Sequence, residues 1–215
     1  MPLLKRSFYI KCVGEECLKL AELIRDKAPA VESMNISIEP YGLRIEMYGY
    51  KSDIRNAWIY IRRIVSAYKS AVIEKKGVRE ISIDFLVEKI GRTFPPRLLE
   101  FIMKKKGYTA RIEGDKIITE ANIEDITDII KKMIEILDEI RFEIRGTACK
   151  YFIVASSVLS GKDHHAIIEL GLANKILGRD RDGKIVLKKE WRSAVDQILK
   201  YFESPNSIKD NSSGL

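Results

Sequence analysis

The stretch from Ile83 to Leu137 constrains the fold more than any other part of the chain. It contains two short helical patterns, a tight hairpin and a long helical pattern, and a strand pattern, Arg79–Ile83, leads into it. The predicted elements are the helices Asp84–Ile90 and Pro95–Lys106, the paired strands Tyr108–Glu113 and Lys116–Glu120, and a closing helix from Asn122. This order predicts an α+β module over residues 79–145.

The junction between the two short helices reads Ile90-Gly91-Arg92-Thr93-Phe94. With the element order, it resembles the KH fold of RNA-binding proteins, in which an Ile-Gly-x-x-Gly loop between two helices clamps a nucleic-acid backbone. This chain keeps the first glycine, Gly91, and has Phe94 where the second is expected. The resemblance implies a KH-like module with an incomplete Gly-x-x-Gly loop. The alternative is a packed loop that only starts the next helix, since Pro95 suits a first helical turn.

A plan of helix, hairpin and helix occurs three times along the chain. Its turn glycines, Gly42, Gly114 and Gly183, are 72 and 69 residues apart. The first copy, residues 1–78, is predicted to form a strand, a helix, two paired strands and a long helix, namely Ser7–Val13, Gly14–Lys27, Met34–Ile38, Leu43–Met47 and Ser52–Glu74. We interpret this copy as a degenerate KH-like module, because it has one helix where a KH domain has two.

The third copy, residues 146–203, begins with predicted helices over Ala148–Leu159 and Asp163–Leu172. A hairpin with Asp182-Gly183 at its turn and a final helix follow. This pattern fits an αββα module or a winged-helix-like module. Residues 204–215 turn polar and predict a disordered tail. The predicted fold class is therefore α+β, with tandem KH-like modules followed by an αββα or winged-helix-like module.

The composition is that of a globular protein with a buried core. The 215 residues are 46% hydrophobic and 32% charged. The chain lacks the ~18 consecutive apolar residues of a membrane helix, and its first residues lack the apolar region of a signal peptide. We therefore expect a cytoplasmic protein without a membrane partner. The single glutamine, Gln197, and the many charged side chains are usual in proteins of thermophiles.

Patterns for catalysis, metal binding or cofactors are missing from the sequence. Cys12-x4-Cys17, with only His164 and His165 downstream, matches zinc-site spacing poorly, so the cysteines are interpreted as buried or incidental thiols. Adjacent histidines on a helix point about 100° apart, which argues against a shared metal. Walker A, dinucleotide-binding and nucleophile motifs are also missing. We predict that the chain is not an enzyme and has no metal site and no cofactor.

Positive charge is concentrated in the first module. Residues 1–78 carry 14 Lys and Arg against 9 Asp and Glu, whereas residues 79–145 carry 13 against 14. Because non-specific affinity for nucleic acid comes largely from cations at phosphates, the KH-like module is not expected to be the main electrostatic contact. The most basic stretch is the long helix, where Asp53 and Glu74 are the only acids between residues 51 and 76.

Ten residues are the predicted nucleic-acid contacts. Five lie on the long helix, and these are Lys51, Arg55, Arg62, Arg63 and Lys69. Five lie in the KH-like module, and these are Gly91, Arg92, Arg97, Lys104 and Lys105. The macrodipole is an alternative reason for lysines at a helix end. The long helix also has an apolar seam at steps of four and three, which predicts Trp58 and Tyr68 as core residues; the seam is Ile54, Trp58, Ile61, Val65, Tyr68 and Val72.

Over about residues 7–203 the chain also resembles an archaeal family of uncharacterised basic proteins, most clearly at Leu43–Ala57 and Lys106–Ile130. Our first hypothesis is a non-enzymatic RNA-binding protein of translation or RNA processing. One alternative is a protein-interaction scaffold. Another is DNA binding through the winged-helix-like segment, with contacts from Lys175, Arg179, Arg181 and Lys184.

Overall fold

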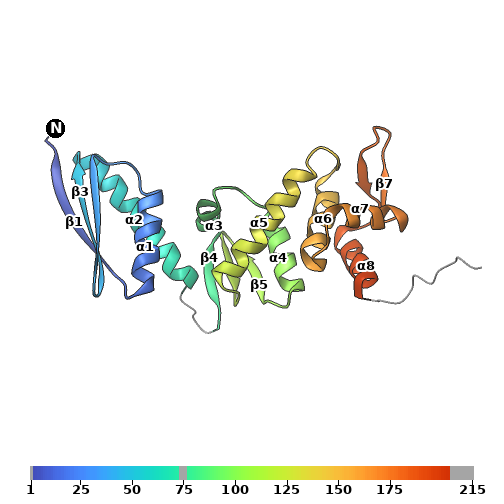
Figure 1. Cartoon of the computed structure of the whole chain (residues 1–215), viewed down its shortest axis with the longest axis horizontal. Helices are drawn as coiled ribbons and strands as arrows, with labels where there is room; N and C mark the ends of the chain where they lie inside the picture. The colour runs from blue at the N-terminus through green and yellow to red at the C-terminus, as the bar shows by residue number, and fades with distance from the viewer. Residues whose placement is uncertain (1, 73–76, 204–215) are drawn as a thin grey trace, which may run out of the picture. The chain divides into compact units, whose positions relative to one another are not determined.

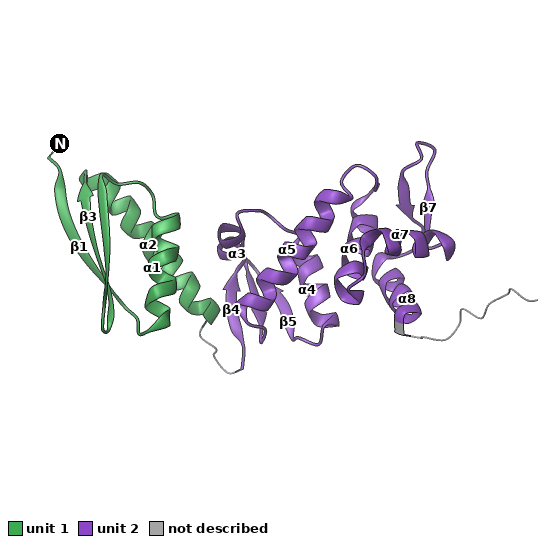
Figure 2. Ribbon diagram, in the orientation of Figure 1, with its two compact units in different colours: residues 1–75 green, residues 76–215 purple. Residues whose placement is uncertain are grey.

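The computed structural model describes residues 2–72 and 77–203. The chain divides into two compact units, residues 1–75 (unit 1) and 76–215 (unit 2), which Figure 2 shows in different colours. The predicted modules 79–145 and 146–203 both fall within unit 2. The predicted tail, residues 204–215, and the predicted helix end at Glu74 lie outside the described residues. Within the described ranges, no helix is long and apolar enough to cross a membrane.

Unit 1 is a three-stranded antiparallel sheet with two helices on one of its faces (Figure 1). In chain order its elements are β1 (Leu4–Lys11), α1 (Glu15–Lys27), β2 (Ser33–Glu39), β3 (Gly42–Gly49) and α2 (Lys51–Val72). The strand order β1-β3-β2 places β3 in the centre. All five predicted elements are present. β1 lies earlier than predicted, because it pairs with β3 from Leu4 opposite Gly49 to Lys11 opposite Gly42.

The core of unit 1 lies between the sheet and its helices. Leu43, Ile45 and Met47, at alternate positions of β3, are each 0% exposed. α1 adds Leu20 and Ile24, which are also 0% exposed. Alternation of apolar and polar residues along a half-buried strand therefore sets which side of the sheet meets the helices.

The predicted seam of α2 is partly wrong. Tyr68 is buried as predicted, but Trp58 is only half-buried, where it stacks on Phe8 of β1 with ring centroids 4.1 Å apart. Val72 is 42% exposed. The buried stripe is turned toward Ala57 and Ala71, both 0% exposed. Small side chains allow close packing, and periodicity alone does not distinguish two neighbouring stripes on one helix.

The first half of unit 2 contains the elements predicted from the sequence, in the predicted order. They are β4 (Arg79–Ser82), α3 (Ile83–Ile90), α4 (Pro96–Lys105), β5 (Ala110–Glu113), β6 (Lys116–Thr119) and α5 (Ile123–Glu139). The strands form an antiparallel sheet in the order β4-β6-β5. After α4, Gly107 adopts a φ of 93° and its N–H donates to the carbonyl of Lys104, as expected of a glycine that ends a helix.

The second half of unit 2 packs directly on the first. It contains α6 (Thr147–Ser160), α7 (His164–Ala173), β7 (Leu177–Arg179), β8 (Ile185–Leu187) and α8 (Trp191–Glu203). Residues 152–158 of α6 are all buried, and α6 contacts α4, α5, α7 and α8. A helix that is apolar on all sides is expected to be buried in this way. The order of helix, helix, hairpin and helix fits both predicted alternatives for this segment.

The interpretation of Cys12 and Cys17 as incidental thiols is wrong. Their sulfurs form a disulfide, with Cα atoms 5.2 Å apart. The chain turns back at Gly14, which has a φ of 57°, so the residue after β1 faces the first turn of α1. Cys149 is a buried free thiol, as predicted. Sequence spacing identified the poor zinc match, but only the tight turn shows that the two sulfurs meet.

Candidate nucleic-acid interface

Four of the five predicted basic residues of α2 share one face of the helix. At about 100° per residue, Lys51, Arg55, Arg62 and Lys69 lie within about 40° of one another around the axis. With a rise of about 1.5 Å per residue, they form a stripe about 27 Å long. This stripe lies beside the buried positions Ile54 and Ile61 and is largely exposed to solvent. We call these four residues the α2 stripe.

A groove of about 710 Å³ runs along part of the α2 stripe. Its cations are Arg62, Arg63 and Lys69 of α2. The rest of its lining is small or apolar and consists of Ile10, Ile59, Val65, Ser66 and Ser70. Because Ile10 belongs to β1, the groove lies where α2 meets the edge strand of the sheet.

Two groove cations are held in place by neighbouring groups. Lys69 Nζ donates to the carbonyl oxygen of Lys11 at 2.6 Å and lies 3.8 Å from Glu16 Oε1. The Arg63 guanidinium lies 5.3 Å from the centroid of the Tyr60 ring. Lys69 thereby ties α2 to the end of β1 and to α1.

The other cations of the α2 stripe are unpaired. Among the residues that the structure describes, no carboxylate forms an ion pair with Lys51, Arg55 or Arg62, and all three side chains are exposed. An unpaired cation has no internal partner to give up when it meets a phosphate. The α2 stripe is therefore the strongest candidate surface for an anionic polymer.

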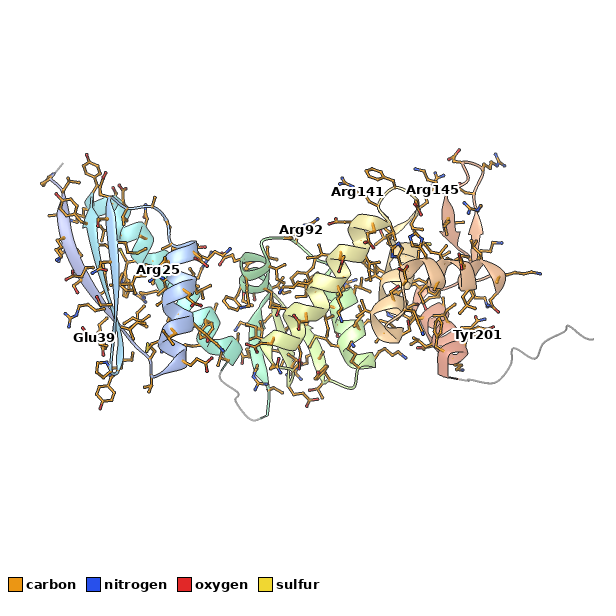
Figure 3. All side chains as sticks on the ribbon, viewed as in Figure 1. Arg25, Glu39, Arg92, Arg141, Arg145 and Tyr201 are labelled. Carbon is orange, nitrogen blue, oxygen red and sulfur yellow. A yellow bond between two sulfur atoms is a disulfide. The ribbon has the colours of Figure 1, made fainter. Side chains whose placement is uncertain are left out.

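The loop with the incomplete Gly-x-x-Gly pattern is packed and internally paired. Gly91 ends α3 with a φ of 79°, and Phe94 is only 8% exposed. Arg92, labelled in Figure 3, makes two hydrogen bonds to the carboxylate of Asp138 near the end of α5, and Arg92 Nη2 lies 2.8 Å from Asp138 Oδ1. These hydrogen bonds lower the pKa of Asp138 and raise the pKa of Arg92. The geometry favours the packed-loop alternative over a backbone clamp.

The three remaining predicted contacts, Arg97, Lys104 and Lys105, do not form a single surface of unpaired positive charge. Lys104 pairs with Glu100 at 2.6 Å, and Lys105 pairs with Asp196 of α8 at 2.5 Å. Arg97 is exposed and borders a separate hollow that also includes Glu100. The structure brings the α2 residues together in unit 1 and leaves the unit 2 residues dispersed and largely neutralised.

One cluster of side chains has donor atoms that suit a metal ion. Atoms of Asp163, His164 and His165 lie within 4.8 Å of one another, and His164 Nδ1 lies 3.2 Å from Glu139 Oε2. The prediction that adjacent histidines point too far apart is wrong at this helix end, where the two rings have centroids 4.1 Å apart. Asp163 also caps α7, since its Oδ1 accepts the His165 N–H at 2.6 Å. A capping role explains Asp163, and the predicted absence of a metal stays a prediction.

The open face of the unit 1 sheet was not predicted from the sequence. Both helices cover the opposite face, so this one presents Tyr9 of β1 and Tyr48 of β3, which are 46% and 42% exposed. The signal was present in the alternation of β1 and β3, where the positions between buried residues are polar or aromatic.

Comparisons with known proteins identify relatives but add no activity. Residues 12–196 match a family described as an uncharacterised protein conserved in archaea (DUF2067). None of the curated proteins matches the chain. A chain in the crystal structure of an a/eIF2alpha–aDim2p–rRNA complex from Pyrococcus horikoshii OT3 is similar at 15% identity over 80% of this chain and 94% of that one, with a TM-score of 0.20. A score this low supports no statement about fold or function.

Proposed function

Because the chain belongs to this archaeal family, whose description assigns no activity, we propose from the geometry that it is a non-enzymatic RNA-binding protein. Its main electrostatic contact is the α2 stripe with the adjoining groove. The observation that carries the proposal is one helix face with three exposed cations, Lys51, Arg55 and Arg62, for which the described part of the chain provides no carboxylate partner.

The length and chemistry of the α2 stripe suit a nucleic-acid backbone. A nucleic-acid strand carries one negative charge per nucleotide, so a row of cations about 27 Å long can contact several phosphates in succession. The groove next to the stripe adds Arg63 and two serine hydroxyls, Ser66 and Ser70, as further donors to phosphate oxygens. The KH-like element order of unit 2 favours RNA as the nucleic acid.

Charge reversal of the stripe tests the proposal. The triple variant Lys51→Glu, Arg55→Glu and Arg62→Glu leaves no broken ion pair behind, because these side chains have none among the described residues. Affinity for RNA, measured by fluorescence anisotropy at low salt, should fall at least tenfold. The slope of log K against log salt should shrink by about 2, since each phosphate contact with a single strand contributes about 0.7.

A matched control changes the same amount of charge elsewhere. The triple variant Lys175→Glu, Arg181→Glu and Lys184→Glu also lowers the formal charge from +7 to +1, but it alters exposed residues of unit 2. Affinity for RNA should stay within about threefold of the wild type. Equal losses of RNA affinity in both variants would mean that net charge, and not the α2 stripe, accounts for the loss. A loss of duplex DNA binding in the control variant alone would favour the DNA alternative. Undetectable RNA binding by the wild type at low salt would refute the proposal.

A further inference from the structure

The open face of the unit 1 sheet combines exposed aromatic rings with cations. Tyr9 lies directly opposite Arg44 across the β1–β3 pair, and Tyr48 lies directly opposite Lys5. Residues directly opposite each other project to the same face of a sheet. Each exposed tyrosine therefore has a basic neighbour, and the aromatic and charged groups alternate across the two strands.

The Tyr9 ring lies along the sheet and does not stand away from it. A Cβ atom on Gly42 would be 2.6 Å from Tyr9 Cζ and 2.7 Å from its hydroxyl oxygen. The ring thus covers the position where any other residue would place a side chain, while 46% of Tyr9 remains exposed. An aromatic ring that rests on backbone with its outer side open is suited to stacking against a flat partner.

The other side chains on the open face of the unit 1 sheet are polar, and this polarity indicates which kind of molecule can bind there. Ser7, Ser33, Asn35 and Glu46 occupy the positions beside the tyrosines, so hydrogen-bonding groups surround the rings. Large aliphatic side chains do not occupy these positions, so this face lacks the apolar core of a stable protein interface. Exposed aromatics with polar neighbours on an antiparallel sheet are the arrangement that stacks the bases of single-stranded RNA.

The attraction for phosphate comes from the other side of β1. On the open face, Arg44 pairs with Glu39 at 2.5 Å and Lys5 pairs with Glu46 at 3.1 Å, so this face has little net charge. The groove with Arg62, Arg63 and Lys69 is bordered by Ile10, the residue after Tyr9. Successive residues of a strand point to opposite faces, so Tyr9 and the cationic groove lie on opposite sides of edge strand β1.

We infer that the open sheet face of unit 1 binds unpaired bases of single-stranded RNA, with Tyr9 and Tyr48 as stacking residues. The inference rests on the proposed function and adds the class of RNA. The tyrosines are four residues apart along neighbouring strands, about 13 Å, so they contact two bases that are not adjacent in the RNA. The backbone of the strand crosses β1 toward the cationic groove. A duplex, whose bases are already stacked, offers no faces to these rings.

The test compares the variant Tyr9→Thr/Tyr48→Thr with the wild type on two probes, a 12-nucleotide oligouridylate and a 12-base-pair RNA duplex. Threonine keeps the β-propensity of the strands and removes the rings. Affinity for the oligouridylate should fall about tenfold or more, as expected for the loss of two stacked bases. Affinity for the duplex should change less than threefold. The double Tyr→Phe variant, which keeps both rings, should bind both probes like the wild type.

A second measurement and a matched control separate stacking from misfolding. Tyr201 in unit 2 is 46% exposed, the same as Tyr9, and Tyr201→Thr should leave both affinities unchanged. Oligonucleotides with 4-thiouridine should crosslink to Tyr9 or Tyr48 in the full chain, and mass spectrometry should locate the adducts. The inference would be overturned if the double Thr variant bound oligouridylate with wild-type affinity, or if the crosslinks lay outside β1 and β3. Either result would leave the proposed function standing. Absence of any RNA binding by the wild type would instead overturn the proposed function.

Discussion

At the residue scale, the disulfide between Cys12 and Cys17 fixes the junction between β1 and α1. Both cysteines are buried, at 4% and 1% exposure, so the bond is enclosed by the core that the sheet and helices form. The disulfide closes a short loop at the same place where Lys69 holds α2 to the end of β1. The turn at Gly14 is thus tied down from two sides.

Thiol titration checks the disulfide directly. The chain has three cysteines, and burial raises the pKa of the Cys149 thiol to about 12. An Ellman reagent should therefore find no reactive thiol in the native protein, one after unfolding without reductant, and three after unfolding with reductant followed by its removal. Three thiols in the unreduced, unfolded chain would show that the bond is not formed.

The Arg92–Asp138 pair makes a prediction about acid stability. The pKa of Asp138 is lowered by its hydrogen bonds from Arg92, so the folded state binds this proton less readily than the unfolded chain. The stabilising contribution is present above the unfolded carboxyl pKa and is lost as pH falls through the lowered native pKa. Asp138→Asn should therefore reduce the dependence of unfolding free energy on pH between about 5 and 2.

Urea unfolding at a series of pH values measures this effect. Asp128→Asn, an exposed aspartate on the same helix, is the control and should leave the acid limb as in the wild type. RNA affinity at neutral pH should be unchanged by Asp138→Asn. A marked increase in affinity would mean that the pair restrains Arg92 from an RNA contact, and the packed-loop reading of this junction would then be incorrect.

At the element scale, α2 serves two purposes with neighbouring stripes of one helix. One stripe packs on the sheet through Ile54, Ile61 and Tyr68, and the α2 stripe presents cations beside it. The division follows from helical geometry, because residues three, four and seven apart return to the same side. Alternate residues of the edge strand β1 likewise face the two sides of the sheet. Its odd-numbered positions from Lys5 to Lys11 face the open side, and Phe8 and Ile10 face the helices.

At the scale of the whole molecule, the two compact units have separate cores. Unit 1 has its own set of residues at 0% exposure, which includes Leu20, Leu43, Ile45 and Ile61. Unit 1, residues 1–75, is near the lower end of the size range of folded domains. The Cys12–Cys17 disulfide stabilises it by about 2 kcal/mol by restricting the unfolded chain. The α2 stripe, the groove and the tyrosine face all belong to unit 1.

A fragment of residues 1–75 should therefore fold alone when oxidised and keep the affinity of the full chain for single-stranded RNA to within about tenfold. Circular dichroism and thermal melting measure the folding, and anisotropy measures the binding. Cys12→Ala/Cys17→Ala in the same fragment should lower the unfolding free energy by about 2 kcal/mol. A folded fragment without RNA affinity would move the proposed interface to unit 2.

Local patterns along the chain predict the helices and strands of this protein and their order. Helices, strands, the turn at Gly183 and the cap at Gly107 depend on interactions between residues close in the chain, which leave a readable period or a glycine. Helical geometry also places Lys51, Arg55, Arg62 and Lys69 on one face of the long helix, because positions four and seven residues apart return to the same side.

Which of these features contact one another depends on the tertiary fold. Arg92 finds Asp138 46 residues away, and Lys105 finds Asp196 on another helix, so two predicted contacts are internally neutralised. The groove requires β1 beside α2, and the open tyrosine face requires both helices on one side of the sheet. These arrangements depend on strand register and packing between distant segments, which leave no periodic trace in the sequence.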